Sequence, residues 1–526
     1  MDAKRPTAGV HLAAVDAVIE QAIHDGNIPG AVLIVGHNGQ VIYRKAYGSR
    51  ALEPRREAMT LDTIFDLASL TKVIMTTTAV MQLVERGKVR LNDPVANYLP
   101  EFKQNGKEDI TVRQLLTHYS GLEPDMNLKT AWEGKQTAYQ MAFTESPEDP
   151  PGSKFSYSDI NFIVLGALVE QVSGESLVEY STRHIFAPLK MTHTRFVPPL
   201  SRRACWIEKI APTQYDENEH MLRGVVHDPT ARRMGGVAGH AGLFSTADDL
   251  AKFAQALLNG GGGILSPLSV EKMTQPEQPP AAPVLRGFGW DIDSPFSSNR
   301  GDLLPVGSYG HTGFTGTSLW IDPTTKTYII LLTNAVHPRG GNAIALRSKV
   351  ATAVAAALPL TATEKEALRG RSITGYNEAQ SAARRMNSRN GAVKNGIDVL
   401  EEHKFDILQV ADRKKRVGLV TNQTGIDADG RRTIDVLARA PGVSLDAIFS
   451  PEHGVTGTLD TLHVSDTKDD ATGVTVYSVY GGKDAARRPS LDVLKQLDAV
   501  VFDIQDAGAP FFTYETTLGY FLEAVA

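Results

Sequence analysis

The chain has 526 residues, of which 42% are hydrophobic and 22% are charged. This composition is typical of a soluble globular protein, and the length indicates two or three domains. The net charge is −6 and both signs are interspersed, so we expect no nucleic-acid partner. No stretch approaches the roughly 18 apolar residues of a membrane span, so none is expected. The one cysteine, Cys205, excludes an intramolecular disulfide and is expected to be a small buried hydrophobe.

The N-terminal region predicts a helix followed by a β-hairpin. "LAAVDAVIEQAI" at 12–23 repeats apolar residues with a helical period and lacks the apolar core of a secretory signal. As the sequence stands, we expect a cytoplasmic protein, which would be periplasmic or secreted if a signal had been removed. In residues 31–48, two β-rich runs flank Asn38-Gly39, a strong signal for a hairpin turn.

The next elements complete a mixed domain. Apolar periodicity predicts helices over 71–86, 111–117, 159–173 and 245–258, the last with Ser245 or Thr246 as its N-cap. A second hairpin is expected over 317–336, with its turn at 322–325. We therefore expect an antiparallel sheet that is opened and closed by strands from the two ends of this region.

A second domain is predicted after a polar stretch at 361–394, which we interpret as a linker. Apolar runs at 416–422, 445–451, 475–481 and 497–508 follow, with helical stretches between them. This spacing predicts βαβ units and a mostly parallel sheet. The expected domains are thus 1–360 and 395–526.

"FDLASLTKVIMT" at 65–76 places Lys72 three residues after Ser69, so on a helix the two side chains share one face. A serine hydroxyl is a weak nucleophile unless a base adjoins it. A lysine serves as that base when desolvation or nearby cations lower its pKa. On spacing alone, an N-cap serine beside a solvated lysine remains the alternative.

Two further stretches strengthen the catalytic interpretation. "PGSKFSYSDINF" carries Tyr157 just before an apolar helix, and "YGHTGFTG" carries His311 at a strand. A serine and lysine, then a tyrosine, then a basic residue followed by Thr-Gly resembles the penicillin-recognising serine hydrolases. The likeness is to class C β-lactamases, family VIII carboxylesterases and D,D-peptidases, over about 10–358. "QLLTHYSGL", "GLFSTADDLAKF" and "GFGW" agree with it.

The resemblance implies an α+β fold, a β-lactamase/transpeptidase-like five-stranded antiparallel sheet with flanking helices and a helical lobe. It implies that Ser69 is the nucleophile, Lys72 its proton acceptor or electrostatic activator, and Tyr157 a second acid or base. Whether Lys72 or Tyr157 takes the first proton stays open. By resemblance, the oxyanion hole is formed by the backbone N–H groups of Ser69 and Phe314. No cofactor and no metal are expected.

The expected substrate-binding residues are His311, Thr312, Gly313 and Asp159. Many relatives carry lysine in place of His311, which is expected to be cationic only part of the time near neutral pH. Many class C β-lactamases carry asparagine in place of Asp159, and an acid there repels the carboxylate of a β-lactam. These departures favour a neutral ester or an amine-bearing substrate. Of the other histidines, His118 is expected to be a structural turn residue and His240 a candidate to line the cleft.

The second domain has its own resemblance. "VGLVTNQTGID", "AIFSPEHGVTG" and "VVFDIQDAGAPFFTYETTLGYFLEA" resemble the N-terminal, Rossmann-like part of the exo-β-N-acetylmuramidase family, over about 395–526. That family trims terminal N-acetylmuramic acid from peptidoglycan fragments. Glu452 is carried over as a candidate catalytic acid. The match stops before the family's second subdomain, so we expect an incomplete domain without independent muramidase activity.

Three functions follow as hypotheses. The first is a family VIII-type carboxylesterase that forms an acyl-enzyme on Ser69 with small esters and has at most weak β-lactamase activity. The second is a D,D-peptidase or D-amino-acid amidase that acts on muropeptides. The third is an inactive cell-wall-binding protein, against which the intact catalytic set argues. The expected partner is therefore a small ester, amide or muropeptide substrate, and the sequence leaves the oligomeric state open.

Overall fold

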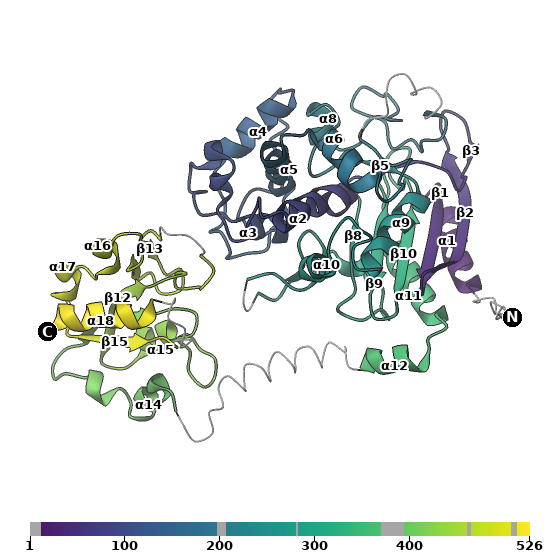
Figure 1. Cartoon of the computed structure of the whole chain (residues 1–526). Coiled ribbons are helices and arrows are strands. Elements are labelled where there is room, and N and C mark those ends of the chain that lie inside the picture. The colour runs from purple at the N-terminus through teal and green to yellow at the C-terminus, as the bar shows by residue number, and fades with distance from the viewer. Residues whose placement is uncertain (1–11, 197–206, 280–281, 370–393, 460–463, 506–512) are drawn as a thin grey trace. The chain divides into compact units, whose positions relative to one another are not determined.

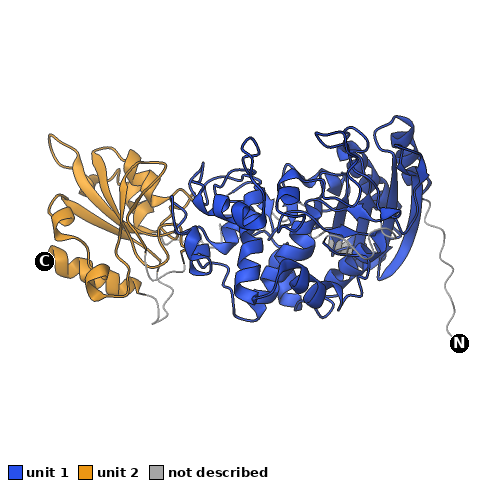
Figure 2. Cartoon of the chain, turned by 90° about the horizontal axis from the view of Figure 1, so that it is seen from above, with its two compact units in different colours: residues 1–373 blue, residues 374–526 orange. Residues whose placement is uncertain are grey.

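The computed structural model describes residues 12–196, 207–279, 282–369, 394–459, 464–505 and 513–526. The chain divides into two compact units, Met1–Ile373 and Thr374–Ala526 (Figure 2). The division falls within the stretch that we interpreted as a linker. Cys205 lies outside the described residues. Among the helices that the structure describes, none has the length and apolar character that a membrane crossing needs.

The first unit is built on one antiparallel sheet with the strand order β3-β2-β1-β10-β9-β8-β7-β6. Its five longer strands are contiguous and form the predicted five-stranded sheet, and three short strands extend it at the two edges. The longer strands are β1 (Gly30–His37), β2 (Gln40–Ala51), β8 (Tyr309–Thr312), β9 (Ser318–Asp322) and β10 (Thr327–Leu332), and the short ones are β3 (Glu57–Ala58), β6 (Leu285–Arg286) and β7 (Asp291–Asp293).

Both predicted hairpins are confirmed. Asn38 and Gly39 have φ values of 50° and 77°, the left-handed conformation that a tight hairpin turn requires, and they join β1 to β2. Strands β9 and β10 pair antiparallel, with Asp322 opposite Thr327. The Asp322 carboxylate accepts the backbone N–H of Thr324 at 3.0 Å, which fixes the turn.

The sheet is buried on both faces, and β1 shows how. Leu33 and Val35 pack against α1 (Ala13–His24) and α11 (Ile344–Ala357) in one core. Val32 and Ile34 point the opposite way, into the larger core formed with α2 (Thr78–Glu85), α5 (Asp159–Ser173) and α9 (Ala247–Leu258). This alternation follows from the two-residue period of a strand. Helices α2 to α5 gather beside the sheet as the expected helical lobe (Figure 1).

Each helix that the apolar pattern predicts in this unit is present, and further helices were not indicated by the sequence. The N-cap of α9 is Thr246, whose hydroxyl accepts the N–H of Asp249. The other helices of this unit are α3 (Val112–Thr117), α4 (Lys135–Thr144), α6 (Leu177–Ser181), α8 (Pro229–Arg233), α10 (Pro267–Thr274) and α12 (Ala362–Arg369), with a short π-helix η4 (Thr182–Phe186) and short 3₁₀ turns η2 (Val95–Asn97), η3 (Pro100–Phe102) and η6 (Ser297–Arg300).

The predicted helix over 71–86 differs in its first turns. Residues Lys72–Thr77 (η1) form a π-helix, and α2 continues the helix from Thr78. The Thr78 hydroxyl donates to the carbonyl of Val73, five residues earlier, at 3.1 Å, a bond that fits the wider turn. Such π-helical turns are common at functional sites.

The second unit contains the predicted parallel sheet, in the order β13-β14-β12-β11-β15, with β13 as an antiparallel edge strand that the sequence did not indicate. Its elements are β11 (Lys415–Thr421), β12 (Val443–Ser450), β13 (Thr467–Lys468), β14 (Thr475–Ser478), β15 (Ala499–Asp503), α14 (Gly396–Glu402), η7 (Asp406–Leu408), α15 (Thr433–Arg439), α16 (Asp484–Arg487), α17 (Leu491–Leu494) and α18 (Tyr514–Val525).

Candidate active site

Ser69 lies in a constrained turn between β4 (Phe65–Asp66) and η1. The residue before it, Ala68, has a φ of 47°, a left-handed conformation that costs energy for a residue with a side chain. The buried Asp66 carboxylate holds this turn, since it accepts the N–H of Ala68 at 3.0 Å and that of His227 at 2.7 Å. The conformation is thus maintained by bonds from two parts of the chain.

Lys72 is completely buried, and its ammonium group has three acceptors. It lies 3.0 Å from Ser69 Oγ, 3.1 Å from the main-chain oxygen of His240 and 2.6 Å from Asp159 Oδ1. The first two contacts are hydrogen bonds and the third is an ion pair. The structure therefore brings the predicted serine and lysine together and gives Asp159, which we expected to meet substrate, a contact with Lys72.

The charge of Lys72 follows from these neighbours. Burial alone lowers the pKa of Lys72, but the carboxylate of Asp159 and the hydroxyl of Tyr157 raise it by more, so the pKa lies above its ordinary value. From the sequence we expected that desolvation could lower the pKa of Lys72 and make it a base. The counterion Asp159, together with Tyr157, has the opposite effect on this pKa, and their combined effect is larger. Lys72 is an ammonium ion at neutral pH and can stabilise negative charge on Ser69.

The side chain of Tyr157 extends from the loop before α5 to Ser69 and Lys72. Its ring stacks on His118, with centroids 4.5 Å apart, and its hydroxyl hydrogen-bonds with Ser69 and Lys72. Burial raises the pKa of Tyr157, while Lys72 lowers it, and the net shift is upward. The phenol therefore keeps its proton in the free enzyme and can exchange it with Ser69.

His118 has the structural role that the sequence indicated. It ends α3 in the left-handed conformation, with a φ of 62°. Its Nδ1 accepts the backbone N–H of Ser158 at 3.0 Å, beside Tyr157. Burial, Arg286 and Lys72 hold the pKa of His118 well below its usual range, so the ring is neutral. It supports the loop that carries Tyr157.

His311 is also neutral, which corrects our expectation of a partly cationic side chain. Burial comes first, and then Arg286 and Lys72, in holding the pKa of His311 well below its ordinary value. Its Nδ1 lies 2.7 Å from the carbonyl oxygen of Thr312, so Nδ1 carries the proton and donates it. The ring centroid is 6.0 Å from that of Tyr157, which places His311 beside the phenol. Arg286, buried and paired with Asp291, is the cation that the sequence argument missed.

The segment after β8 is tied to the approach to Ser69. Thr315 Oγ1 donates to the carbonyl of Asp66 at 2.8 Å, and Thr317 Oγ1 donates to that of Leu67 at 3.1 Å. These bonds hold Phe314, whose N–H is the second expected oxyanion donor, near the serine segment. The Phe314 side chain is 74% exposed and stacks on His227 at 5.5 Å.

Position 313 requires a glycine because of its neighbours within the protein. A Cβ at this position would clash with the carbonyl oxygen of Leu67 and with Thr317 Oγ1. The neighbour that leaves no room is therefore the backbone leading to Ser69. Gly313 allows the two segments with the expected oxyanion donors to pack together.

We predict that Gly313→Ala lowers kcat by roughly 10²–10³-fold, the usual cost of one oxyanion donor. The added methyl pushes the strand away from Leu67 and moves the N–H of Phe314. The test is kcat beside the thermal unfolding temperature. A variant that unfolds normally and keeps full kcat would contradict this assignment of the glycine.

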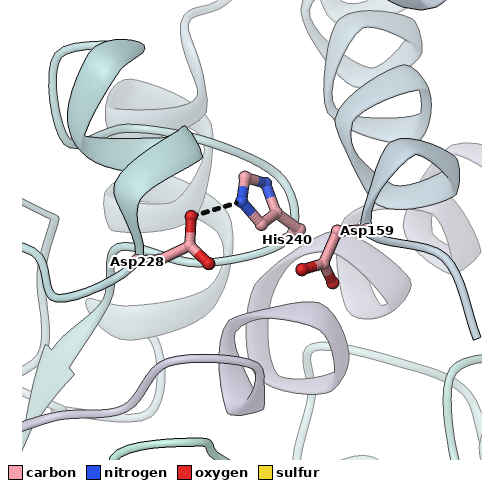
Figure 3. A group of neighbouring side chains, drawn as sticks. All are labelled: Asp159, Asp228 and His240. Carbon is pink, nitrogen blue, oxygen red and sulfur yellow. Dashed lines mark hydrogen bonds and ion pairs between the residues drawn. The ribbon is translucent and has the colours of Figure 1, made fainter. Parts of the chain in front are cut away.

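Asp159, Asp228 and His240 form a group whose ligand atoms lie within 4.8 Å of one another (Figure 3). His240 is completely buried, and its Nε2 lies 3.0 Å from Asp228 Oδ1. Burial lowers the pKa of His240, but Asp228 raises it by more, and the net pKa is raised. Asp228 therefore favours the protonated imidazole, while the ammonium of Lys72 neutralises Asp159. Figure 3 shows the His240 imidazole directed at Asp228.

Asp66 gives the fold a pH dependence. Burial raises the pKa of Asp66 from 3.8 to about 6, against two backbone hydrogen bonds that lower it. Folding therefore favours the protonated acid, and its stabilising contribution is complete below pH 3.8 and lost as the pH rises through about 6. The difference between the pKa of Asp66 in the folded and unfolded states corresponds to about 3 kcal/mol of folding free energy.

We predict that the free energy of unfolding of the wild type, relative to Asp66→Asn, falls by about 2.5 kcal/mol between roughly pH 4 and pH 7. Subtracting the free energy of unfolding of Asp66→Asn from that of the wild type at each pH cancels the contributions of the other titrating groups. Urea unfolding at each pH measures it. A difference that stays constant with pH would show that Asp66 titrates normally.

In the second unit, Glu452 follows β12 at the carboxyl end of the parallel sheet, where ligands bind in such folds. Tyr480 OH donates to its Oε1 at 3.1 Å, and the N–H and hydroxyl of Thr513 donate to its Oε2 at 3.2 and 3.1 Å. These donors hold the carboxylate in place. A catalytic role for Glu452 stays a prediction.

Each of the two units matches a known protein family. The sequence profile of the Beta-lactamase family matches residues 15–353, and that of "Exo-beta-N-acetylmuramidase NamZ, N-terminal" matches residues 417–526. The Escherichia coli K12 protein named "Putative D-alanyl-D-alanine carboxypeptidase" is 32% identical over 360 residues, which cover 61% of this chain and 82% of that protein. The "N-acetylmuramyl-L-alanine amidase" of Bacillus subtilis is 36% identical over 370 residues, 62% of this chain and 81% of that protein.

Solved structures confirm the fold. EstCE1, described as a hydrolase with promiscuous acyltransferase activity, superimposes with a TM-score of 0.55 at 24% identity, covering 65% of this chain and 98% of that one. A penicillin-binding protein homologue from Caulobacter crescentus has a TM-score of 0.55 at 22% identity, covering 66% and 97%. The chain belongs to the β-lactamase family of serine hydrolases, and its second unit is a NamZ-type N-terminal domain.

Proposed function

We propose that the first unit hydrolyses an amide bond in peptidoglycan fragments through an acyl-enzyme on Ser69. The observation that carries this proposal is the joining, in one chain, of a serine hydrolase unit and a domain that matches the N-terminal part of a muramidase. Two units of one chain commonly act on one class of substrate. The names of the E. coli and B. subtilis relatives, a carboxypeptidase and an amidase, point to the same material.

The site chemistry suits such a reaction. Ser69 Oγ attacks the amide carbon and passes its proton to the Tyr157 oxygen, while the proton that this phenol already carries moves to the amide nitrogen. The C–N bond then breaks, the amine leaves, and Tyr157 is again a neutral phenol. Lys72, held as an ammonium ion by Asp159, stabilises the charge that develops on Ser69 Oγ. Water then hydrolyses the ester on Ser69 and releases the acid. The N–H groups of Ser69 and Phe314 are the proposed oxyanion donors.

A carboxylesterase remains the second candidate, because one structural neighbour, EstCE1, is described as a hydrolase with promiscuous acyltransferase activity. The same acyl-enzyme would form on a small ester. The wide exposure of the Phe314 ring offers an apolar surface to either kind of acyl group. The two functions differ in the leaving group, which is an alcohol in one case and an amine in the other.

One substrate panel separates the candidates. Wild type and Ser69→Ala would be offered N-acetylmuramyl-L-alanyl-D-isoglutamine, a D-alanyl-D-alanine peptide, p-nitrophenyl butyrate and nitrocefin. We expect Ser69-dependent cleavage of one of the two peptidoglycan amides, detected by mass spectrometry. Turnover of the ester alone would replace the proposal by the carboxylesterase. Failure of a fluorophosphonate to label the wild type would favour an inactive binding protein.

A further inference from the structure

One of the three acceptors of the Lys72 ammonium is a main-chain carbonyl, that of His240. The position of this oxygen depends on the loop 238–243, which lies against the serine segment. Hydrogen bonds tie the two together: Leu67 N–H to Leu243 O at 2.9 Å, Leu243 N–H to Thr71 Oγ1 at 3.2 Å, and Thr76 Oγ1 to Gly239 O at 2.6 Å. The loop 238–243 therefore supports residues 67–76, the segment that carries Ser69 and Lys72.

The side chain of His240 fixes the loop from its other side. The imidazole is completely buried and bonds to Asp228 Oδ1 at 3.0 Å. Asp228 is itself held, because it caps α8 and accepts the N–H of Ala231 at 2.7 Å. A continuous series of contacts thus runs from the start of α8 through Asp228 and His240 to Lys72 and Ser69.

We propose that Asp228 and His240 are a positioning pair for the nucleophile: Asp228 fixes the His240 imidazole, and the His240 carbonyl then aims the Lys72 ammonium at Ser69. The pair acts through Lys72 and touches no reacting atom. This inference rests on the proposed Ser69 chemistry, and it adds two residues to which neither the family resemblance nor the sequence assigned this role.

The pair also affects how tightly Lys72 holds its proton. The charged groups that face His240 are Asp228 from the start of α8, Asp159 from α5, Lys72 from η1 and Asp125 from the loop before α4. Asp228 raises the pKa of His240, so the protonated imidazole and the Lys72 ammonium share the field of the same carboxylates. Removing the charge of His240 leaves those carboxylates to Lys72, which then holds its proton more tightly.

The test measures the rate constant for labelling of Ser69 by a fluorophosphonate in the full chain. This reaction uses the activated serine and needs no natural substrate. We expect Asp228→Asn and His240→Leu to label up to about 10²-fold more slowly, the cost of a small misplacement in a catalytic group. His240→Gln keeps an N–H for Asp228 and should recover most of the rate. Its pH profile should lack the inflection that the titration of His240 gives to the wild type, because glutamine does not titrate.

The matched control is His37→Gln, which changes a buried histidine at the end of β1 that bonds to Thr327, outside the site. It should keep the wild-type rate and pH profile. Wild-type rates in both Asp228→Asn and His240→Leu would overturn the positioning pair. So would slow labelling by Asp228→Asn with an unchanged pH profile in His240→Gln, which indicates a merely structural role. If the wild type itself does not label, the Ser69 function fails instead.

Discussion

Ser69→Ala is expected to lower kcat roughly 10⁴–10⁶-fold while leaving the fold unchanged. Within the described site, the Ser69 hydroxyl is the nucleophile placed to form the acyl-enzyme, and the residual rate would come from substrate binding and the oxyanion donors. Stability should change little, because Ser69 Oγ gives up only its hydrogen bonds with Lys72 and Tyr157. Activity on the substrate identified by the panel, together with the unfolding temperature, measures both effects.

The matched control is Ser153→Ala, which removes an exposed hydroxyl that donates to the carbonyl of Pro150 in its own turn. It should keep full activity. Trapping provides a second readout, since the acyl-enzyme adds the mass of the acyl group to the wild type but adds nothing to Ser69→Ala. Acylation of the Ser69→Ala protein would place the nucleophile elsewhere.

Local signals explain what could be predicted from the sequence. Asn38-Gly39 requires a left-handed turn whatever surrounds it, and α5 carries a serine cap, an apolar run and a final glycine. Such features depend on neighbouring residues alone. The π-helical turns at Lys72–Thr77 depend on a threonine bond five residues back, and β13 is two residues long, so neither leaves a clear periodic pattern.

The protonation states could not be predicted, because they depend on residues distant in sequence. Asp159 lies 87 positions after Lys72, yet it decides that Lys72 is an ammonium ion. Arg286 contributes to keeping His311 neutral, although nothing near "YGHTGF" indicates a cation. Asp228 did have a local signal, since an aspartate before a proline is a helix start, but its bond to His240 follows from the tertiary fold.

The pairing of Lys72 with Asp159 leads to a prediction that separates stability from catalysis. Lys72→Met removes the cation and leaves Asp159 without its counterion in a largely buried place. We expect the free energy of unfolding to fall by about 3–5 kcal/mol, the usual cost of breaking one side of a buried pair. The rate of Ser69 acylation should fall roughly 10²–10³-fold, because the cation that stabilises negative charge on the serine oxygen is gone.

In the double variant Lys72→Met with Asp159→Asn, both charges are gone and the penalty for an unpaired carboxylate disappears. We expect most of the lost stability to return, as when a buried ion pair is replaced by neutral groups, while acylation stays as slow as in Lys72→Met. The control is Lys107→Met, since Lys107 is equally buried but lies over Phe102, away from the site, and its loss should leave acylation unchanged. If acylation recovered together with stability, Lys72 would be a structural residue, and the charge placed beside Ser69 would have no part in the reaction.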